Sequence, residues 1–177
     1  MKIVDIQCFP LRTDLSRAIG FSQWYYHTKN NFVLKVMCDD GTVGWGECYG
    51  PNLAIAASVE HHFKPLLIGK DPLQNEVLWN FMWRAYCDFN RYGIFMAAIS
   101  GIDIALWDIK GKALNTPVRV LLGGSSKPLP CYATGMYYRD DKPEAEMLAE
   151  LIDEAATYVD AGSVSYTHLT LPTTGVV

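Results

Sequence analysis

The chain has 177 residues, of which 50% are hydrophobic and 19% charged, and its formal net charge is −4 at pH 7. This composition is typical of a globular protein long enough for one domain and part of a second. The sequence has no basic run of the kind that binds nucleic acid, and no apolar stretch reaches the roughly 18 residues of a membrane span. We therefore expect neither a nucleic-acid partner nor a membrane partner.

The cysteines and the N-terminus indicate a cellular compartment. The 5 cysteines are scattered and form no CxxC pair. We therefore expect no zinc site and no disulfide framework, and reduced thiols are typical of a cytoplasmic protein. Asp5 lies where a targeting peptide would carry its apolar core. A cytoplasmic localisation follows as the expectation.

The N-terminal residues predict a strand and then a long loop. Residues 2–11 alternate in polarity, which places Val4, Ile6 and Cys8 on one face of a half-buried strand. Residues 12–30 have no clear periodicity and are rich in aromatic side chains. Loops of this length are usually functional or disordered, and the aromatic residues argue against disorder. We expect a lid.

A hairpin and a helix are predicted next. Residues 32–38 and 42–48 read as strands joined at Asp39-Asp40-Gly41, which completes a three-stranded antiparallel sheet. A second loop, residues 49–52, follows the hairpin. Asn52 is suited to be the N-cap of a helix that runs to Leu67.

Two further helices are predicted between Asp71 and Pro117. Asp71-Pro72 has the cap-then-proline order of a helix start. The apolar stripe expected for this helix is Leu73, Val77, Phe81 and Ala85. The central helix follows, and its stripe is Ile94, Ala98, Ile102, Ala105, Ile109 and Ala113. Small residues around Gly101 would let another backbone approach this helix, and Pro117 prevents its continuation.

The pattern changes after Pro117. A short helix over residues 118–122 ends at Gly123-Gly124, where glycine supplies the left-handed terminal conformation. Beyond a linker, residues 131–138 predict a strand and residues 143–160 a helix closed by Gly162. The residues expected to point inward from this helix are Met147, Leu148, Leu151, Ile152, Ala155 and Val159. A strand, loop and helix form one β-α unit of a parallel α/β fold.

Three segments carry a family resemblance. They are ALWDIKGKALNTPVRVLLG (residues 105–123), GWGEC (residues 44–48) and RYGIFMAAISGID (residues 91–103). Together they resemble the N-terminal capping domain of the enolase superfamily, in its mandelate racemase/muconate-lactonizing branch. The resemblance covers roughly residues 1–162 and lies in the overall pattern, since no catalytic motif is present.

The resemblance implies a fold and a chemistry. The fold class is α+β: a capping domain with a three-stranded antiparallel sheet and a helical bundle (residues 1–124), then the first β-α unit of an incomplete (β/α) barrel (residues 125–162). In this family, barrel carboxylates bind Mg²⁺, and Lys or His bases remove the proton alpha to a substrate carboxylate. The divalent ion stabilises the enediolate that forms. Two capping-domain loops cover the barrel mouth, and here they correspond to residues 12–30 and the loop after Cys48.

The predicted substrate contacts come from these two loops and, for Glu47, from the end of the hairpin. They are Phe21, Trp24, Tyr26, His27, Glu47 and Tyr49. His27 could equally be a solvated loop residue, and Glu47 could instead cap the neighbouring loop. His61 and His62 are expected to be helix-surface residues, because adjacent helical side chains diverge by about 100°. Asp103 and Asp108, five residues apart, diverge by about 140° on their helix and are assigned structural roles. Trp79 and Trp83 are expected to serve packing or an oligomer surface.

The chain departs from the family pattern after Gly162. No Lys or Arg follows Lys142, and no Asp or Glu follows Asp160, so the barrel lysines and metal ligands are absent. A complete barrel needs about 250 residues. We expect an inactive N-terminal fragment with no catalytic or metal-binding residue of its own, and we interpret residues 163–177 as a non-native tail.

The parent enzyme is expected to be an Mg²⁺-dependent acid-sugar dehydratase, a homo-oligomer whose substrate is a small carboxylate. A racemase, an epimerase or a cycloisomerase is the alternative reaction. A non-catalytic capping or binding module is an alternative of another class. The apolar face of helix 143–160 distinguishes them, because a self-sufficient module would cover it and a fragment would leave it exposed.

Overall fold

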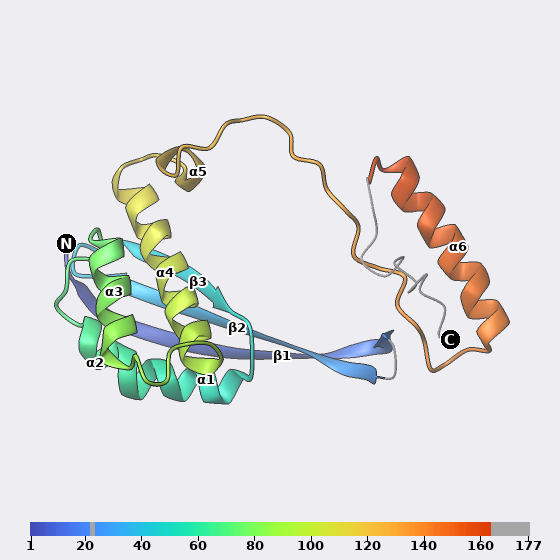
Figure 1. The fold of residues 1–177 in the computed structure, drawn as a ribbon, viewed down its shortest axis with the longest axis horizontal. Helices are drawn as coiled ribbons and strands as arrows, with labels where there is room; N and C mark the ends of the chain where they lie inside the picture. The colour runs from blue at the N-terminus through green and yellow to red at the C-terminus, as the bar shows by residue number, and fades with distance from the viewer. Residues whose placement is uncertain (22–23, 164–177) are drawn as a thin grey trace. The chain divides into compact units, whose positions relative to one another are not determined.

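The structure, a computed structural model, describes residues 1–21 and 24–163. The chain divides into two compact units. Unit 1 contains residues 1–13 and 30–125, and unit 2 contains residues 14–29 together with the chain from Ser126 onward. Figure 1 shows the elements of both. The tail interpreted as non-native, residues 163–177, lies outside the described residues apart from Ser163.

Unit 1 is built on the predicted antiparallel sheet. Its strand order is β1 (Ile3–Phe21), β2 (Trp24–Cys38) and β3 (Val43–Cys48). The β2–β3 register runs from Phe32 opposite Cys48 to Met37 opposite Val43. Gly41 in the connecting turn has φ +83°, the left-handed region that favours glycine. The predicted hairpin is therefore confirmed.

Two expectations for β1 and β2 are wrong. The expected loop over residues 12–30 is absent, because β1 continues to Phe21 and β2 begins at Trp24. Most side chains of residues 9–17 are exposed. Because this part of the strand has no buried face, its sequence shows no alternation of apolar and polar residues. In addition, Val4 is 48% exposed, whereas Ile3 and Ile6 are 1% exposed. The inward face of β1 therefore does not follow strict alternation.

The helix expected from Asn52 to Leu67 has the predicted extent. It consists of α1 (Asn52–Ser58), the π-helical turn η1 (Val59–Phe63) and α2 (Lys64–Leu67). Asn52 is not its N-cap, because Pro51 occupies that position. The Asn52 amide instead donates to the carbonyls of Leu11 and Asn31, at 3.0 and 3.1 Å. Asn52 therefore ties the helix start to the sheet.

The two histidines in η1 differ in environment. His61 is exposed, as expected. His62 is half-buried, its Nδ1 lies 3.2 Å from the Tyr86 hydroxyl, and its ring contacts Phe95. His62 is thus part of an aromatic cluster and not a surface residue.

Helix α3 (Asn75–Ala85) starts later than predicted and buries a different face. Asp71 accepts a bond from the Leu73 amide at 3.0 Å, which makes a turn before the helix. Leu78 and Met82 are buried, whereas Val77 is 60% and Phe81 39% exposed. Each buried residue has an apolar neighbour one position earlier, so the phase of the stripe could not be read from the sequence.

The central helix α4 (Ile94–Ala113) packs closely against β3 (Figure 1). A Cβ on Gly46 would overlap the Gly101 carbonyl oxygen, and one on Gly101 would overlap the Cys48 sulfur. The Asp108 carboxylate accepts a bond from the Trp45 amide at 2.9 Å, which confirms its structural role. The predicted stripe residues that are 0% exposed are Ala98, Ile102, Ala105 and Ile109. Ile94, at the helix start, is 37% exposed and lies outside the core.

The last elements agree with the sequence in part. Helix α5 (Val118–Leu121) is followed by Gly123 at φ +76°, and α6 (Glu144–Asp160) by Gly162 at φ +80°, as expected. Residues 131–138 do not form a strand. Their bridge to Gly20 at Tyr138 is isolated. A strand needs a partner along its length, and this segment contains single bridge residues, at Ala133 and Tyr138.

Candidate functional site

The site with the most converging features lies in unit 2, where the tip of the β1–β2 hairpin contacts the segment that precedes α6. The hairpin tip is defined here as residues 14–29. Gly20 and Tyr138 exchange both backbone N–H···O=C bonds, each at 2.8 Å. A Cβ on Gly20 would lie 2.7 Å from the Tyr138 carbonyl oxygen. Only glycine permits this close approach.

A cavity of about 270 Å³ lies beside this bridge. Ala18 from the hairpin tip and Leu151 from α6 are buried next to it. The lining includes charged side chains, among them Arg139 and Glu150. The full lining is Leu15, Ser16, Arg17, Ala18, Ile19, Tyr137, Arg139, Met147, Glu150, Leu151 and Glu154.

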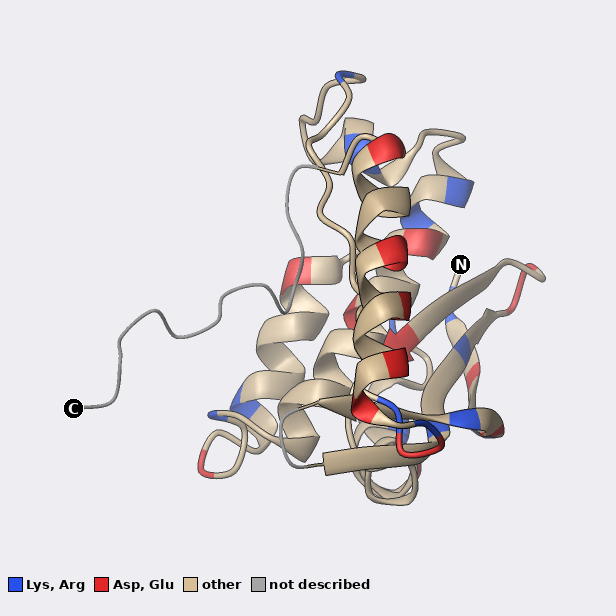
Figure 2. Cartoon of the chain, turned by 90° about the vertical axis from the view of Figure 1, so that its right-hand side faces the viewer, with Lys and Arg blue, Asp and Glu red and all other residues tan. Residues whose placement is uncertain are grey.

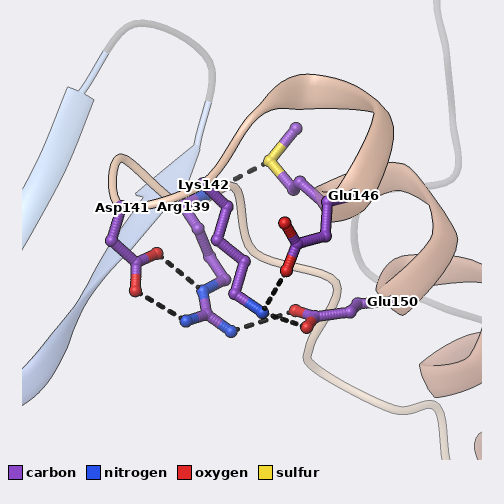
Figure 3. Close-up of polar contacts among 6 residues, drawn as sticks. Arg139, Asp141, Lys142, Glu146 and Glu150 are labelled. Atoms are coloured by element: carbon purple, nitrogen blue, oxygen red, sulfur yellow. Dashed lines mark hydrogen bonds and ion pairs between the residues drawn. The ribbon is translucent and has the colours of Figure 1, made fainter.

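A network of ion pairs joins the segment after Tyr138 to the first turns of α6 (Figure 3). Arg139 binds Asp141 through two parallel bonds of 2.9 and 2.7 Å, and Glu150 through a third of 3.0 Å. Lys142 pairs with Glu150 and, at 3.2 Å, with Glu146. Figure 2 shows that α6 carries acidic residues without Lys or Arg, so both cations of the network come from outside the helix.

The network shifts the pKa values of its members in the expected directions. The hydrogen bonds from Arg139 lower the pKa of Asp141, and those from Lys142 lower the pKa of Glu150. Bonds to Asp141 and to Glu150 raise the pKa values of Arg139 and Lys142 respectively. Each charged form is thus stabilised by its partner. The network fixes residues 139–142 against α6.

A second anchor lies around Glu154. The Met136 amide donates to Glu154 at 3.1 Å, and the Tyr158 hydroxyl donates to the same oxygen. This bond raises the pKa of Tyr158. Gly135 is buried beside the Tyr158 hydroxyl and has no room for a side chain. The chain before α6 is therefore held at two points, Glu150 and Glu154.

The predicted substrate contacts of the hairpin tip are exposed side chains. Phe21 and Tyr26 stack with ring centroids 5.3 Å apart and planes 23° apart. Trp24 is 65% exposed. His27 Nε2 lies 3.6 Å from an Asp140 carboxylate oxygen, an ion pair when the imidazole is protonated.

The other two predicted contacts belong to unit 1. Glu47 accepts a bond from the Asn31 amide at 3.0 Å, and Tyr49 is 98% exposed. Asn31 belongs to β2, so this bond joins β3 to β2 and tests neither the substrate contact nor the loop cap. Phe21 and Tyr26 are in direct contact, whereas Glu47 and Tyr49 lie in the other compact unit.

The described residues contain no group of three or more His, Cys, Asp or Glu side chains that could hold a metal ion. Magnesium needs several oxygen ligands in near-octahedral geometry, so this part of the chain does not fit it. The helices in residues 1–21 and 24–163 include none that is both long and apolar enough to span a bilayer.

Arg139, Lys142 and Glu150 were not singled out from the sequence. The signal was the charged run Arg139-Asp140-Asp141-Lys142 directly after the predicted strand 131–138. In (β/α) barrels, functional residues lie at the carboxyl ends of the strands and in the loops that follow them. A charged run at such a position could have been recognised as part of a site.

Comparison with known proteins places the chain in a family. The chain is 39% identical over 142 residues to D-galactarolactone cycloisomerase of Agrobacterium fabrum, a match that covers 80% of this chain and 37% of that protein. It is 38% identical over 157 residues to arabinonate dehydratase of Saccharolobus solfataricus, which covers 88% and 41%. The crystal structure of 3,6-anhydro-D-galactonate cycloisomerase from Zobellia galactanivorans matches with a TM-score of 0.78 and 40% identity, over 94% of this chain and 42% of that one.

The chain therefore spans about two fifths of the length of these relatives, 37 to 42%. The family described as "Mandelate racemase / muconate lactonizing enzyme, N-terminal domain" matches residues 7–123. Apart from residues 3–6 at the start of β1, the three-stranded sheet and the helices that cover it lie within that match. The chain belongs to the mandelate racemase/muconate-lactonizing family of the enolase superfamily, and residues 7–123 are its N-terminal domain.

Proposed function

We propose that this chain is the capping domain and first β-α unit of an Mg²⁺-dependent enzyme that removes the proton alpha to the carboxylate of an acid sugar. Dehydration is the favoured outcome, because an arabinonate dehydratase and a D-galactonate dehydratase are among the relatives. Two cycloisomerases among the matches keep cycloisomerisation as the alternative reaction. Residues 1–124 and 125–162 are the two domain segments in this proposal.

The observation that carries the proposal is the bridge between Gly20 and Tyr138. Tyr138 ends the segment 131–138, which corresponds to the first barrel strand. Active sites of (β/α) barrels lie at the carboxyl ends of their strands. A hairpin bonded at that end is suited to cover the barrel mouth, although it consists of strands where a loop was expected.

The hairpin tip supplies the substrate contacts in this proposal. Phe21, Trp24 and Tyr26 offer aromatic faces, and His27 offers a polar group. Binding sites for small molecules usually combine aromatic side chains with a few polar groups. Glu47 and Tyr49 are the second group of substrate contacts in this proposal. The network of Arg139 and Lys142 has a different role, since its charges are already paired with Asp141 and Glu150.

The metal ligands and the acid/base residues lie in barrel strands beyond this chain in our proposal. Bound Mg²⁺ would stabilise charge on the substrate carboxylate as the alpha proton leaves. The described residues offer no cluster for it, so the chain alone is expected to be inactive. Its contribution is to bind the substrate and to exclude water from the barrel mouth.

The exposure of apolar residues on helix α6 favours the interpretation of the chain as a fragment over that of a self-sufficient module. Leu148, Ile152 and Val159 were expected to point inward, yet they are 47%, 69% and 61% exposed. Leu151, at 9% exposed, is the buried apolar residue of this helix. An apolar helix face of this size is normally covered by a neighbouring element. Further barrel units would cover it.

The test compares the chain 1–177 with the complete protein encoded by the uninterrupted source gene. Both are assayed with D-galactonate and arabinonate, with and without Mg²⁺. We expect Mg²⁺-dependent turnover by the complete protein and none by the chain 1–177. Turnover by 1–177 above a blank would contradict the proposal, as would failure of the complete protein on every acid sugar tested.

The role of the hairpin tip has its own test in the complete protein. Trp24→Ala and Tyr26→Ala should raise KM for the acid sugar, with the Mg²⁺ requirement unchanged. Tyr92→Ala is the matched control, because Tyr92 is 81% exposed and belongs to neither proposed contact group. An unchanged KM in both tip variants would remove the hairpin tip from the substrate site.

A further inference from the structure

The outer edge of strand β3 is covered by two charged side chains of helix α4. In the sheet order β1-β2-β3, β3 is a terminal strand, and among the described residues it pairs with β2 alone. A terminal strand presents backbone N–H and C=O groups that can pair with a strand of another chain. Whatever occupies these groups in β3 therefore decides whether its edge is open to such pairing.

Asp108 and Lys112 bond to the backbone of this edge. The Asp108 carboxylate accepts a hydrogen bond from the Trp45 amide at 2.9 Å, and Lys112 Nζ donates to the Val43 carbonyl at 2.8 Å. The two side chains also pair with each other, at 2.6 Å. They lie one helical turn apart on α4, so one face of the helix supplies both an acceptor and a donor.

These two bonds have the arrangement that a neighbouring strand would provide. Gly44 lies between Val43 and Trp45 and opposite Val36 of β2, so the backbone groups of Gly44 face β2 and those of its two neighbours face away. In a parallel pair, one residue opposite Gly44 would donate its N–H to residue 43 and accept with its C=O from residue 45. Lys112 and Asp108 take the positions of that donor and that acceptor.

The edge remains accessible to solvent around this pair. Asp108 is 34% and Lys112 48% exposed. The body of α4 covers a different part of β3, because Gly44 and Gly46 lie directly against the carbonyl groups of Ala105 and Gly101. A second strand could therefore reach the edge, but it would have to displace or bury the two charges.

Burial of these charges would oppose pairing between two copies of the chain. Most homo-oligomers have closed two-fold symmetry, so a contact between two β3 edges brings two copies of the same charged pair together. Removing charged groups from water costs several kcal/mol per ion before any new contact repays it. The few backbone bonds of a short edge return only about 1 kcal/mol each.

We propose that the Asp108–Lys112 pair keeps β3 from pairing with β3 of a second copy of this chain. The pair satisfies two backbone groups of the edge and places on it charges that a second copy would have to bury. The edge of β3 is thus a surface for self-association that the native chain keeps closed. This role is independent of the reaction proposed for the complete enzyme.

The test measures dimerisation of the chain 1–177 by sedimentation equilibrium. Every chain in the comparison carries Leu148→Lys and Ile152→Lys, so that the exposed apolar residues of α6 do not contribute to association. In this background, Asp108→Ala together with Lys112→Ala should lower the Kd of dimerisation about tenfold, because the edge then carries neither charge.

A charge-matched control shows whether the position of the charges matters. Asp103→Ala together with Lys110→Ala removes the same two charges from α4 and spares the two bonds to β3. The Kd of this control should not change. Asp108→Ala alone and Lys112→Ala alone should each associate less than the double variant, because one charge stays on every copy and like charges opposite each other destabilise a sheet.

Hydrogen exchange locates the contact. In a dilute solution of the alanine double variant, the Trp45 amide has lost its acceptor and should exchange about tenfold faster than in the background chain. At concentrations where the dimer predominates, the protection of this amide should return, because a carbonyl of the second β3 accepts its hydrogen bond.

A second double variant decides the question if the alanine variant does not fold. Asp108→Asn with Lys112→Gln keeps an acceptor and a donor at these positions and removes both charges, so it should dimerise more tightly than the charge-matched control. Two results would each overturn the proposal. One is dimerisation of the folded double variants that is no tighter than that of the control, and the other is a Trp45 amide that stays unprotected in the alanine dimer.

Discussion

Gly20 and Tyr138 are joined by a reciprocal pair of backbone hydrogen bonds, each 2.8 Å long, across 118 residues of chain. The bridge connects the tip of the first hairpin to the end of the segment that precedes α6. It depends on the absence of a side chain at residue 20, since a Cβ there would lie 2.7 Å from the Tyr138 carbonyl oxygen. The hairpin tip and this segment consequently form one compact unit.

Gly20→Ala should break this bridge. The added methyl group would contact the Tyr138 backbone, which cannot move aside as a flexible side chain could. We expect the Tyr138 amide proton to exchange about tenfold faster, the equivalent of about 1.4 kcal/mol, or one net hydrogen bond. Hydrogen–deuterium exchange followed by NMR measures this. Ser16→Ala, an exposed change on the same strand, is the control, and equal exchange in both variants would contradict the bridge.

Gly101→Ala should destabilise unit 1. Its Cβ would overlap the Cys48 sulfur, and overpacking of a close helix–sheet contact costs about 1–3 kcal/mol. The urea midpoint of unfolding should fall accordingly. Ser100→Ala, the exposed neighbour on the same helix, should leave the midpoint nearly unchanged. A midpoint for Gly101→Ala as high as that of the control would show that α4 does not approach β3 this closely.

Asn90→Ala should destabilise the end of α3. Asn90 is 0% exposed, and its amide donates to the carbonyls of Met82 and Trp83, at 3.1 and 2.6 Å. Loss of these bonds leaves two carbonyls unpaired, at a cost of about 1–3 kcal/mol. Thermal unfolding measures the effect. The control is Asn80→Ala, an exposed position on α3 whose amide bonds to its own helix, and an equal loss in both would reject the capping role of Asn90.

Acid should release the segment before α6. The folded-state pKa values of Asp141 and Glu150 are lowered by Arg139 and Lys142. Their contribution to stability is therefore complete above the unfolded pKa values and is lost as pH falls through the folded ones. A ¹³C titration of the carboxyl groups should give midpoints below the ordinary Asp and Glu values.

Two variants assign these midpoints. Arg139→Gln should raise the Asp141 midpoint most, because the bonds from Arg139 are the largest cause of its shift. Lys142→Gln should raise the Glu150 midpoint most for the same reason. Midpoints that stay in place in both variants would show that the ion pairs do not form in solution.

The exposed apolar face of α6 should bind a hydrophobic dye. Leu148→Lys together with Ile152→Lys should reduce the dye fluorescence of the chain 1–177 with little loss of stability, because both side chains are exposed. Ala149→Lys, an exposed position without a large apolar side chain, should leave the fluorescence unchanged. Absence of dye binding by the unmodified chain would favour a self-sufficient module over a fragment.

The sequence predicted the parts of the fold where a single buried face decides the pattern. Ala98, Ile102 and Ile109 recur at helical spacing and are fully buried in α4. The Asp39-Asp40-Gly41 sequence is typical of a tight turn, and this turn joins β2 to β3 in the hairpin. The family resemblance depended on residues 44–48, 91–103 and 105–123, and the match to residues 7–123 confirms it.

Other parts could not be predicted, each for a physical reason. Residues 12–21 and 24–30 are mostly exposed, so neither hairpin strand shows alternation there. The phase of α3 depended on whether Val77 or Leu78 faced the core, and both are apolar. The site network formed by Arg139, Lys142 and Glu150 depends on contacts between a loop and a helix, which no local pattern encodes.

The central claim is that this chain belongs to an enzyme that removes the proton alpha to a substrate carboxylate. The most direct measurement uses D-galactonate deuterated at that carbon, with the complete protein, Mg²⁺ and NMR detection of the label. Dehydration, cycloisomerisation and racemisation all begin with this proton, so we predict that the deuterium appears in water as substrate is consumed, and that it stays in place with the chain 1–177. Consumption of the substrate with the deuterium retained in the product would contradict the account.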